Sequence, residues 1–363
     1  MSDISIYVHF PFCKKKCAYC AFYSVCVKSD AIFDAYSDAL CRQIAALPAF
    51  CAKTIYFGGG TPTLMGARRL CRMLDKIFAA VSISADCEIT FETNPNTVDL
   101  GMLKYLKVAG FNRVSAGLQS TDRDTLKLLG RTHTAADFTR FYSDATDSGF
   151  DNIAVDIMFA LPSKTGDELA KTIEYVKTLD PKHISAYSLQ IEEKTPFFKK
   201  RQSLNLPSED CEESEYSLIC KEFCHYSHYE ISSFAKSGFE SKHNSAYWDM
   251  SEYIGLGAAA HSFLSKRRFS APADVNGYIK AVSNDFTSPT NFADSRPEQD
   301  SELDDDRIML ALRTSKGAKL NCFQLKKAKI YADGGFGEIS GDVFWLNERG
   351  FRVSNKIISD ILY

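Results

Sequence analysis

The sequence predicts an α/β fold, in which a parallel sheet is assembled from strand–helix units and a smaller α+β module follows. Up to Leu189, short apolar segments alternate with longer segments whose apolar residues recur at helical spacing, which is typical of parallel sheets. Polar residues and cysteines follow the ends of several of these strands. We expect strands at 4–10, 54–57, 87–91, 113–118, 152–159 and 183–189, and helices at 30–47, 67–80, 100–108, 123–129, 135–146 and 167–178.

The composition is that of a soluble globular protein. The chain has 363 residues, of which 45% are hydrophobic and 25% are charged, and it is long enough for one barrel-sized domain and a smaller one. No apolar run approaches the roughly 18 residues of a membrane span, and no secretory signal is seen. Twelve cysteines then indicate a reducing compartment, so we expect the cytoplasm. A net charge of −3 gives no electrostatic case for nucleic-acid binding.

Three cysteines lie on the loop after the first predicted strand. Cys13, Cys17 and Cys20 fall within eight residues, and thiolates of this kind can hold a soft metal or an iron–sulfur cluster. With three ligands, a four-iron cluster keeps one iron open to a molecule that is not protein. Positive charge in the same loop, at 14–16, favours thiolates. The alternatives are zinc bound with His9 as a fourth ligand, or a redox pair of Cys17 and Cys20.

Other polar groups follow the next strands in turn. A glycine run, 58–60, follows the second strand, Glu92 ends the third, Gln119 ends the fourth, and Asp156 lies within the fifth. In a βα barrel the carboxyl ends of the strands form the site, and a carboxylate in an apolar strand is costly to bury without a partner. We therefore expect one shared site. The glycine run is not followed by the Lys-Ser/Thr of a P-loop, so phosphate cradling is not favoured.

The spacing of the three cysteines, CxxxCxxC, resembles that of the radical S-adenosylmethionine (SAM) enzymes. Further motifs in order resemble the coproporphyrinogen dehydrogenase-like branch of that superfamily, and within it the haem chaperones. They are YVHFPFCKKKCAYCAF, YFGGGTPTLM, ITFETNP, RVSAGLQS, LLGRTH, VDIMFALP, YEISSFAKSGFESKHNSAYW and GLGAAAHSF. The resemblance implies a partial (β/α)6 TIM-like barrel, a [4Fe-4S] cluster whose open iron is chelated by SAM, and a winged-helix-like C-terminal module.

The resemblance also implies roles for individual residues. Tyr7, Gly59 and Glu92 match residues at the first SAM. A second SAM position in the dehydrogenase relatives is matched by Gly60, Thr61, Gln119, Arg131 and Asp156. Tyr19, between two of the cysteines, is expected at the cofactor as well.

Departures from the dehydrogenase pattern favour the chaperone branch. Phe22 stands where the dehydrogenases carry a further Cys, and the arm before the first strand is short. The expected function is therefore to bind haem and transfer it to an acceptor protein, with an electron donor of flavodoxin or ferredoxin type. The alternative is an oxygen-independent coproporphyrinogen III oxidase (dehydrogenase). Alanine replaces the usual Gly at Ala160, and the segment 257–261 lacks the usual Pro-Gly pair, which matters only if the backbone there needs a positive φ.

The segment 243–248 resembles the HNxxYW signature of the haem-chaperone group. Imidazole is a common haem-iron ligand, so His243 is the first candidate for haem, with Tyr247 on the same face if the segment is helical. His261 is the second candidate. Because the cluster cysteines are far away in sequence, we expect the haem site and the cluster site to be separable.

The expected domains are 1–205, 206–290 and 291–363. In the middle part we expect a helix over 210–227 that places Cys220, Cys224 and His228 on one face, a possible metal site, and then a strand at 229–232. The acidic stretch 289–306 is expected to be a surface linker. A helix over 307–313, strand and turn over 344–351 and a final helix over 357–362 complete the prediction.

Overall fold

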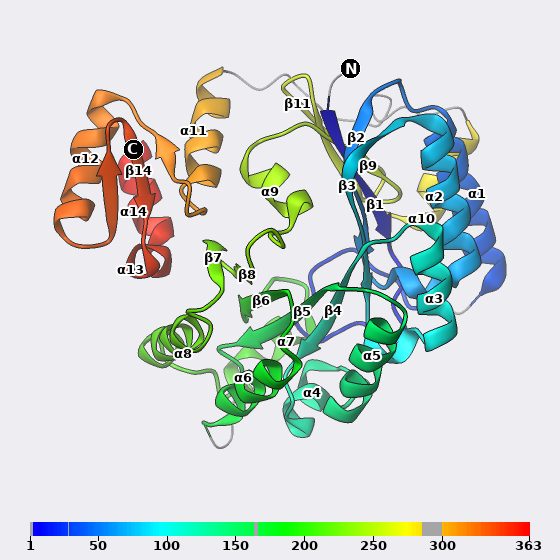
Figure 1. Cartoon of the computed structure of the whole chain (residues 1–363), viewed down its shortest axis with the longest axis horizontal. Helices are drawn as coiled ribbons and strands as arrows, with labels where there is room; N and C mark the ends of the chain where they lie inside the picture. The colour runs from blue at the N-terminus through cyan, green and yellow to red at the C-terminus, as the bar shows by residue number, and fades with distance from the viewer. Residues whose placement is uncertain (1–2, 28, 163–165, 285–299) are drawn as a thin grey trace.

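The computed structural model describes residues 3–27, 29–162, 166–284 and 300–363. Over these residues the main body of the protein is one large mixed sheet with helices on its outer side (Figure 1). In spatial order the strands are β11 (Arg267–Ser270), β10 (His261–Leu264), β9 (Tyr253–Leu256), β1 (Asp3–Phe10), β2 (Cys51–Gly59), β3 (Ser82–Thr93), β4 (Arg113–Gln119), β5 (Asn152–Phe159), β6 (His183–Ser188), β8 (Ser233–Ala235) and β7 (Ser227–Glu230).

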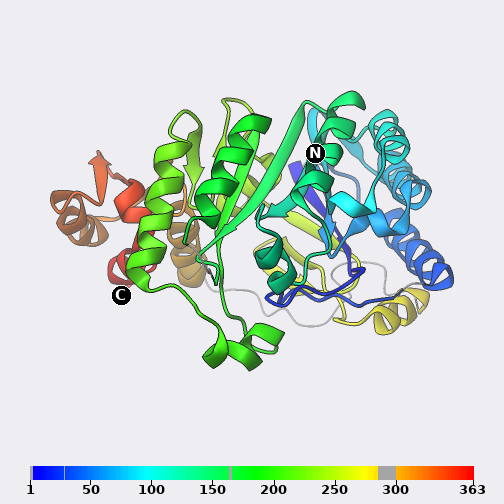
Figure 2. The same cartoon turned by 90° about the horizontal axis from the view of Figure 1, so that it is seen from below.

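The six predicted strand–helix units are confirmed. Strands β1 to β6 pair in parallel in chain order, and Figure 2 shows the first helices lying outside the first strands. Because helices cover one face and the cavity face is enclosed, β4 is buried along its whole length. The connecting helices are α1 (Asp30–Ala45), α2 (Ala67–Ala80), α3 (Leu100–Ala109), α4 (Arg123–Leu129), α5 (Ala135–Asp147) and α6 (Glu168–Leu179).

The parallel strands curve around a common interior, as a partial barrel requires. Side chains from each of them line one cavity, from Tyr7 on β1 to Tyr187 on β6. The strand order runs from β11 to β7 without β6 meeting β1, so within the described residues the barrel is open. This is the predicted α/β class, with a smaller C-terminal domain beside it.

Of the strands that extend both edges of the sheet, the sequence predicts only β7, as a strand at 229–232. β9 pairs in parallel with β1, and β10 and β11 continue from it in antiparallel fashion. On the other edge, β8 pairs with β6 and β7 with β8, both antiparallel. Each is only three or four residues long, which is too short for a clear period-two pattern. These strands belong to the predicted segment 206–290, whose division from 1–205 remains a prediction.

The segment after β6 departs from the prediction in its element bounds. Helix α8 (Glu209–Glu222) ends five residues earlier than expected, and the predicted strand lies at Ser227–Glu230. Its last residue, Glu230, turns the chain into β8 by accepting the Ser232 N–H at 3.1 Å. The HNxxYW segment is helical, as α9 (Lys242–Trp248). The other helices here are α7 (Pro196–Lys200) and α10 (Val275–Ser283).

The C-terminal module combines helices with a small antiparallel sheet, in the order β12–β14–β13. It lies on the side of α8 and β7 (Figure 1). The linker prediction is wrong for 300–306, which forms the first half of α11; the rest of that stretch, 289–299, and the boundary at 290/291 lie outside the described residues. The elements are α11 (Asp300–Ala311), β12 (Ala318–Lys319), α12 (Cys322–Asp333), β13 (Gly337–Ser340), β14 (Val343–Leu346), α13 (Glu348–Arg352) and α14 (Ser354–Leu362).

Two alanines adopt a backbone conformation that favours glycine. Ala160 has a φ of 53° and Ala259 a φ of 61°. Ala160 stands where the family resemblance implies glycine, and Ala259 lies in the segment 257–261, where it implies a Pro-Gly pair. A left-handed conformation costs an L-residue roughly 1–2 kcal/mol. Ala259 is held there because its N–H donates to the Pro272 carbonyl at 2.9 Å while the next N–H turns back to Gly257.

We expect Ala259→Gly to stabilise the protein by about 1 kcal/mol, since it removes this strain. The measurement is the thermal unfolding midpoint of variant and parent under the same conditions. Ala258→Gly is the matched control: Ala258 is buried and has an ordinary φ, so losing its methyl group should lower the midpoint. A lower midpoint for Ala259→Gly would contradict the strain argument.

Candidate functional site

One cavity of about 720 Å³ occupies the interior of the curved sheet. Its wall combines the cysteine loop, the six parallel strands and helix α9. The structure brings the residues predicted for the cluster and for SAM, and the first candidate for haem, to this one cavity, although they span more than 230 positions of the chain. They are Tyr7, Cys13, Cys17, Tyr19, Cys20, Gly59, Gly60, Thr61, Glu92, Gln119, Arg131, Asp156 and His243. His261, the second haem candidate, does not line it.

The cysteine loop is closed at its base by backbone hydrogen bonds. Phe12 and Val25 form a parallel bridge; the Cys13 N–H donates to the Val25 carbonyl at 3.1 Å, and the Val25 N–H donates to Pro11 at 2.7 Å. Within the loop, the Cys20 N–H donates to the Cys17 carbonyl at 3.3 Å. The three thiols are free, and each is partly accessible. The loop therefore presents three thiols on a backbone that is held at both ends.

The chain after β2 holds the loop from one side. The Gly60 N–H donates to the Phe10 carbonyl at 2.7 Å, and the Thr61 N–H donates to the Phe12 carbonyl at 2.8 Å. A Cβ on Gly60 would lie 2.6 Å from the Phe12 oxygen and 3.0 Å from the Cys13 Sγ. Glycine is needed at this position because only a residue without a side chain can approach the loop so closely.

The end of α4 holds the loop from the other side. The Ala18 N–H donates to the Leu129 carbonyl at 2.9 Å, while the Ala18 carbonyl accepts from Phe197 on α7 at 3.0 Å. Gly130 ends α4 in the left-handed conformation, with a φ of 81°, and its backbone packs against residues 16–18. This turn aims the next residue, Arg131, into the cavity.

Arg131 supplies positive charge beside the thiols. One Nη donates to the Cys17 Sγ at 3.6 Å and the other to the Gly117 carbonyl at 2.7 Å. Burial raises the pKa of the Cys13 and Cys20 thiols. The guanidinium therefore offsets part of the cost of forming thiolates in this loop, and a metal centre that displaces the thiol protons would supply the rest.

Two carboxylates from the parallel strands, Glu92 on β3 and Asp156 on β5, face the cavity, and neither forms a salt bridge with the described residues. The Glu92 carboxylate accepts from the Tyr56 hydroxyl at 2.8 Å and from the Gly59 N–H at 3.0 Å. Burial raises the pKa of Glu92 to about 7 and that of Asp156 to about 6. Buried carboxylates of this kind favour a ligand that brings positive charge or hydrogen-bond donors, because such a ligand restores the stability of the charged form.

His243 lies at the floor of the same cavity. Its Nδ1 lies 2.7 Å from the Thr54 hydroxyl, and its Nε2 lies 2.9 Å from the Tyr247 hydroxyl. Its ring stacks on Tyr56 with centroids 4.8 Å apart, the residue is 1% exposed, and burial lowers its pKa to about 3. His243 therefore lines the same cavity as the cluster cysteines, and both of its ring nitrogens are engaged within the protein. That the haem site and the cluster site are separable stays a prediction.

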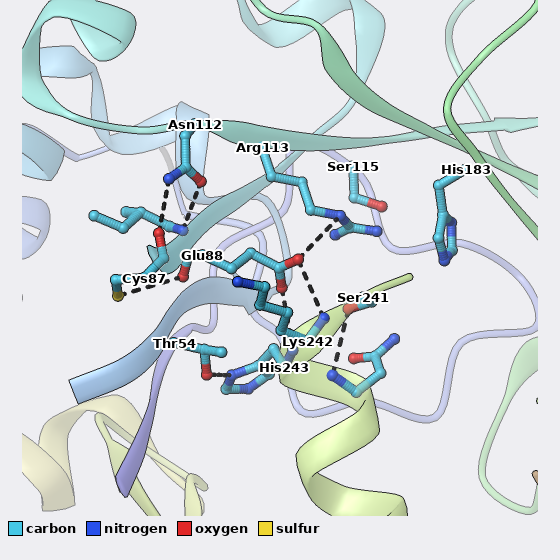
Figure 3. Close-up of polar contacts among 12 residues, drawn as sticks. Thr54, Cys87, Glu88, Asn112, Arg113, Ser115, His183, Ser241, Lys242 and His243 are labelled. Atoms are coloured by element: carbon cyan, nitrogen blue, oxygen red, sulfur yellow. Dashed lines mark hydrogen bonds and ion pairs between the residues drawn. The ribbon is translucent and has the colours of Figure 1, made fainter. Parts of the chain in front are cut away.

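A buried ion pair anchors α9 beneath the cavity (Figure 3). Glu88 accepts the N–H of Lys242 at 3.2 Å and that of His243 at 3.1 Å, and its carboxylate lies 3.8 Å from the Arg113 Nε. Arg113 is 2% exposed and lines the cavity. Sequence reasoning missed this pair, although a charged residue in each of two apolar strands was the signal that could have found it.

The structure does not place His9 as the fourth ligand that the zinc alternative requires. The His9 Nε2 lies 3.1 Å from the Tyr23 carbonyl, so it carries the proton and donates, while Nδ1 lies 2.9 Å from the Tyr7 hydroxyl. His9 is 5% exposed and is not part of the cavity wall. It serves to hold Tyr7 and the loop.

Comparison with known proteins identifies the superfamily. The profile described as radical SAM superfamily matches residues 7–176. The chain is 35% identical to "Heme chaperone HemW" of Bacillus subtilis (strain 168), with 99% of each chain covered, and 31% identical to that of Lactococcus lactis, with 99% of this chain and 97% of the relative covered. Among solved structures, coproporphyrinogen III oxidase (HemN) from Escherichia coli has a TM-score of 0.85 over 99% of this chain and 90% of its own, at 20% identity, a likeness of fold alone.

The fold, the three-thiol loop and the family match together define a radical SAM protein. Within that superfamily, the chain belongs to the HemW family, whose members it matches along its whole length. Membership of the superfamily implies a [4Fe-4S] cluster and SAM. The residues fit both groups: three free thiols share one wall of the cavity, the space beside them holds unpaired carboxylates, and no disulfide consumes the cysteines. Among the described helices, none is long and apolar enough to cross a membrane.

We expect Glu92→Gln to stabilise the ligand-free protein at pH 8 by up to about 3 kcal/mol, and to have much less effect at pH 4.5. The folded pKa of Glu92, about 7, lies above the ordinary value of 4.5 for a glutamate side chain. The folded state therefore binds the Glu92 proton more tightly than the unfolded state does. This contribution to the free energy of unfolding is fully present below pH 4.5 and is lost as the pH rises through about 7. Unfolding midpoints across this range measure the effect, with the exposed Glu338→Gln as control. A pH-independent difference would contradict the linkage.

We expect Cys17→Ala to abolish the intact four-iron cluster and to leave the fold unchanged, because the thiol lies on a loop outside the core and its loss leaves two protein ligands. Iron and sulfide analysis, visible absorption and the paramagnetic signal of the reduced protein measure the cluster, and circular dichroism the fold. Cys26→Ala, an exposed cysteine after the loop, is the control. Unchanged iron content in Cys17→Ala would show that Cys17 is not a ligand.

Proposed function

We propose that this protein is a radical SAM haem chaperone, which binds haem and transfers it to an acceptor protein. The observation that carries the proposal is the match to proteins named Heme chaperone HemW over 99% of this chain, with up to 35% identity. The site supports the radical SAM part of this proposal, because the thiols, the carboxylates and the guanidiniums line a single cavity. We place the activity in the cytoplasm, where twelve free cysteines persist.

The alternative function is oxygen-independent oxidation of coproporphyrinogen III. HemN has the same fold, but at 20% identity the likeness extends no further than the fold. Phe22 occupies the position where the dehydrogenase pattern carries another cysteine, and it is 71% exposed. This substitution and the full-length HemW matches favour the chaperone.

The chain's own residues suggest how the cofactors would be held. Cys13, Cys17 and Cys20 would bind three irons of the cluster, and the cluster would supply an electron to SAM. Glu92, oriented by the Tyr56 hydroxyl and the Gly59 N–H, would receive the SAM amino group. Tyr7 contributes an aromatic wall on the same side, with its ring 6.1 Å from that of Tyr56.

Further polar groups surround the rest of the cavity. Arg131 and Asp156 offer one positive and one negative group near Gln119, and Thr61 and Tyr19 complete this side of the wall. We propose these residues for the second position that the dehydrogenase relatives use for SAM. Whichever ligand binds there, the two charged groups would orient it because each has few partners within the protein.

An electron donor would dock on the cysteine loop. Lys14, Lys15 and Lys16 are exposed there beside the exposed ring of Phe22, and a basic patch around an apolar contact suits an acidic redox protein of flavodoxin or ferredoxin type. The thiols lie on the same loop, which would keep the electron path short.

The haem ligand needs an accessible nitrogen. Ligation by His243 would require breaking the hydrogen bond to Tyr247 and opening the floor of the barrel. His261, at the start of β10, is exposed and lies in the same sheet. We therefore propose His261 as the haem ligand and assign His243 to support of the SAM site.

The test is haem titration of the cluster-loaded protein under anaerobic conditions, beside an assay with coproporphyrinogen, SAM and a reductant. We expect a saturable Soret spectrum and no decarboxylated product. His261→Ala should weaken haem binding at least tenfold, while His225→Ala, another exposed histidine, should match the parent. His243→Ala should weaken SAM binding and spare haem.

Product formation without haem binding would establish the alternative function. If His243→Ala, and not His261→Ala, lost the haem spectrum while SAM binding was retained, the ligand would return to His243. Equal haem binding by all three variants would exclude His225, His243 and His261 as the ligand.

A further inference from the structure

A second set of metal-binding side chains lies outside the cavity, where the C-terminal module meets the main sheet. One ligand atom each of Cys220, His228 and Glu348 lies within 4.8 Å of the other two. Cys220 belongs to α8, His228 to β7 and Glu348 begins α13, more than 110 residues further along the chain. The sequence prediction of a site on one helix face is wrong, because α8 ends at Glu222 and Cys224 is exposed beyond it.

These three side chains are of the types that zinc prefers. Thiolate, imidazole and carboxylate are its protein ligands, and three of them leave a fourth position for solvent. With metal–ligand bonds of about 2.0 to 2.3 Å, ligand atoms at the corners of a tetrahedron lie about 3.3 to 3.8 Å apart. Starting from separations within 4.8 Å, each side chain would need to move inward by only about 1 Å.

The His228 imidazole is held by packing, and its Nε2 makes only weak hydrogen bonds. The His228 ring stacks on Phe234, with centroids 4.2 Å apart and planes inclined by 18°, and Phe351 of α13 lies 5.1 Å away. The contacts of its Nε2, to the Tyr216 hydroxyl at 3.4 Å and the Ile231 carbonyl at 3.5 Å, are at the limit of a hydrogen bond. A metal would therefore displace no strong bond at this ring.

The other two ligands are also available. Cys220 is a free thiol that is 1% exposed, and Glu348 is exposed, with no ion pair to it found in the described parts of the chain. The nearby cation, Arg352, is already paired with Glu213 at 3.0 Å. Two anionic ligands and one neutral imidazole would balance a divalent cation.

We propose that Cys220, His228 and Glu348 form a site for a divalent transition metal, best suited to Zn²⁺. Such a site would fasten the C-terminal module to the main sheet, at a joint that backbone contacts already make. Ser315 donates to the Tyr229 carbonyl at 3.0 Å, and Ile231 donates to the Arg313 carbonyl at 2.9 Å. His228 lies on β7, whose Tyr229 carbonyl accepts one of these bonds, Cys220 lies on α8, and Glu348 lies on α13 of the C-terminal module.

The test is equilibrium dialysis of the cluster-loaded, chelator-washed protein against Zn²⁺, followed by elemental analysis. We expect one zinc per chain in the parent, and at least tenfold weaker binding in Cys220→Ser and Glu348→Gln. The matched control is Cys224→Ser, an exposed cysteine on the same segment, which should bind zinc as the parent does. Zinc should also raise the unfolding midpoint of the parent and leave that of Glu348→Gln unchanged.

A triple cysteine variant distinguishes zinc bound at the proposed site from zinc bound at the cluster cysteines. In a variant with Cys13, Cys17 and Cys20 all changed to Ala, the zinc should still bind. Because Glu348 is exposed, Glu348→Gln is expected to fold, so its result is decisive. Equal zinc affinity in the parent, Cys220→Ser and Glu348→Gln, or no bound zinc in the parent, would overturn the proposal.

Discussion

The geometry of the cavity depends on the close approach of the chain after β2 to the cysteine loop. Two backbone hydrogen bonds, from Gly60 to Phe10 and from Thr61 to Phe12, join the ends of β1 and β2 beyond their ladder. Each is worth about 1 kcal/mol net, but their main effect is positional. The thiols lie on a loop whose ends are fixed by hydrogen bonds from neighbouring segments, so these bonds position the three thiols relative to the cavity.

The same cavity keeps charges that a purely structural interior would neutralise. Burial raises the pKa values of Glu92 and Asp156. The Arg131 guanidinium donates to one carbonyl oxygen and one thiol rather than to a carboxylate. Burying charges without partners costs stability. Charged groups that are kept together on one cavity wall at a cost in stability are typical of a ligand-binding site, because functional sites often sacrifice stability.

Much of the fold and of the candidate site could be predicted because the signals are local. Alternating strands and helices, three cysteines in eight residues and polar residues at or near several strand ends all lie within short windows. The missed features are set by contacts distant in sequence. The short strand β9 is defined by its pairing with β1 and β10. The role of Glu88 is explained by the N-terminus of α9, whose N–H groups it accepts. The strain at Ala259 likewise reflects a turn that the sequence did not specify.

The position of α9 gives the HNxxYW segment a structural connection to the cavity carboxylate Glu92. Glu88 holds the first N–H groups of the helix, His243 connects Thr54 on β2 to Tyr247, and its ring stacks on Tyr56, whose hydroxyl orients Glu92. A continuous path of hydrogen bonds and stacked rings therefore runs from the floor of the barrel to the carboxylate proposed for SAM.

A histidine in that path serves best when it does not move, whereas a ligand for transferable haem must become free when the haem leaves. These are opposite demands on one side chain. The burial of His243 meets the first, and an exposed histidine such as His261 meets the second. In this chain, the burial of His243 and the engagement of both its nitrogens fit the proposed support of the cavity better than direct contact with haem.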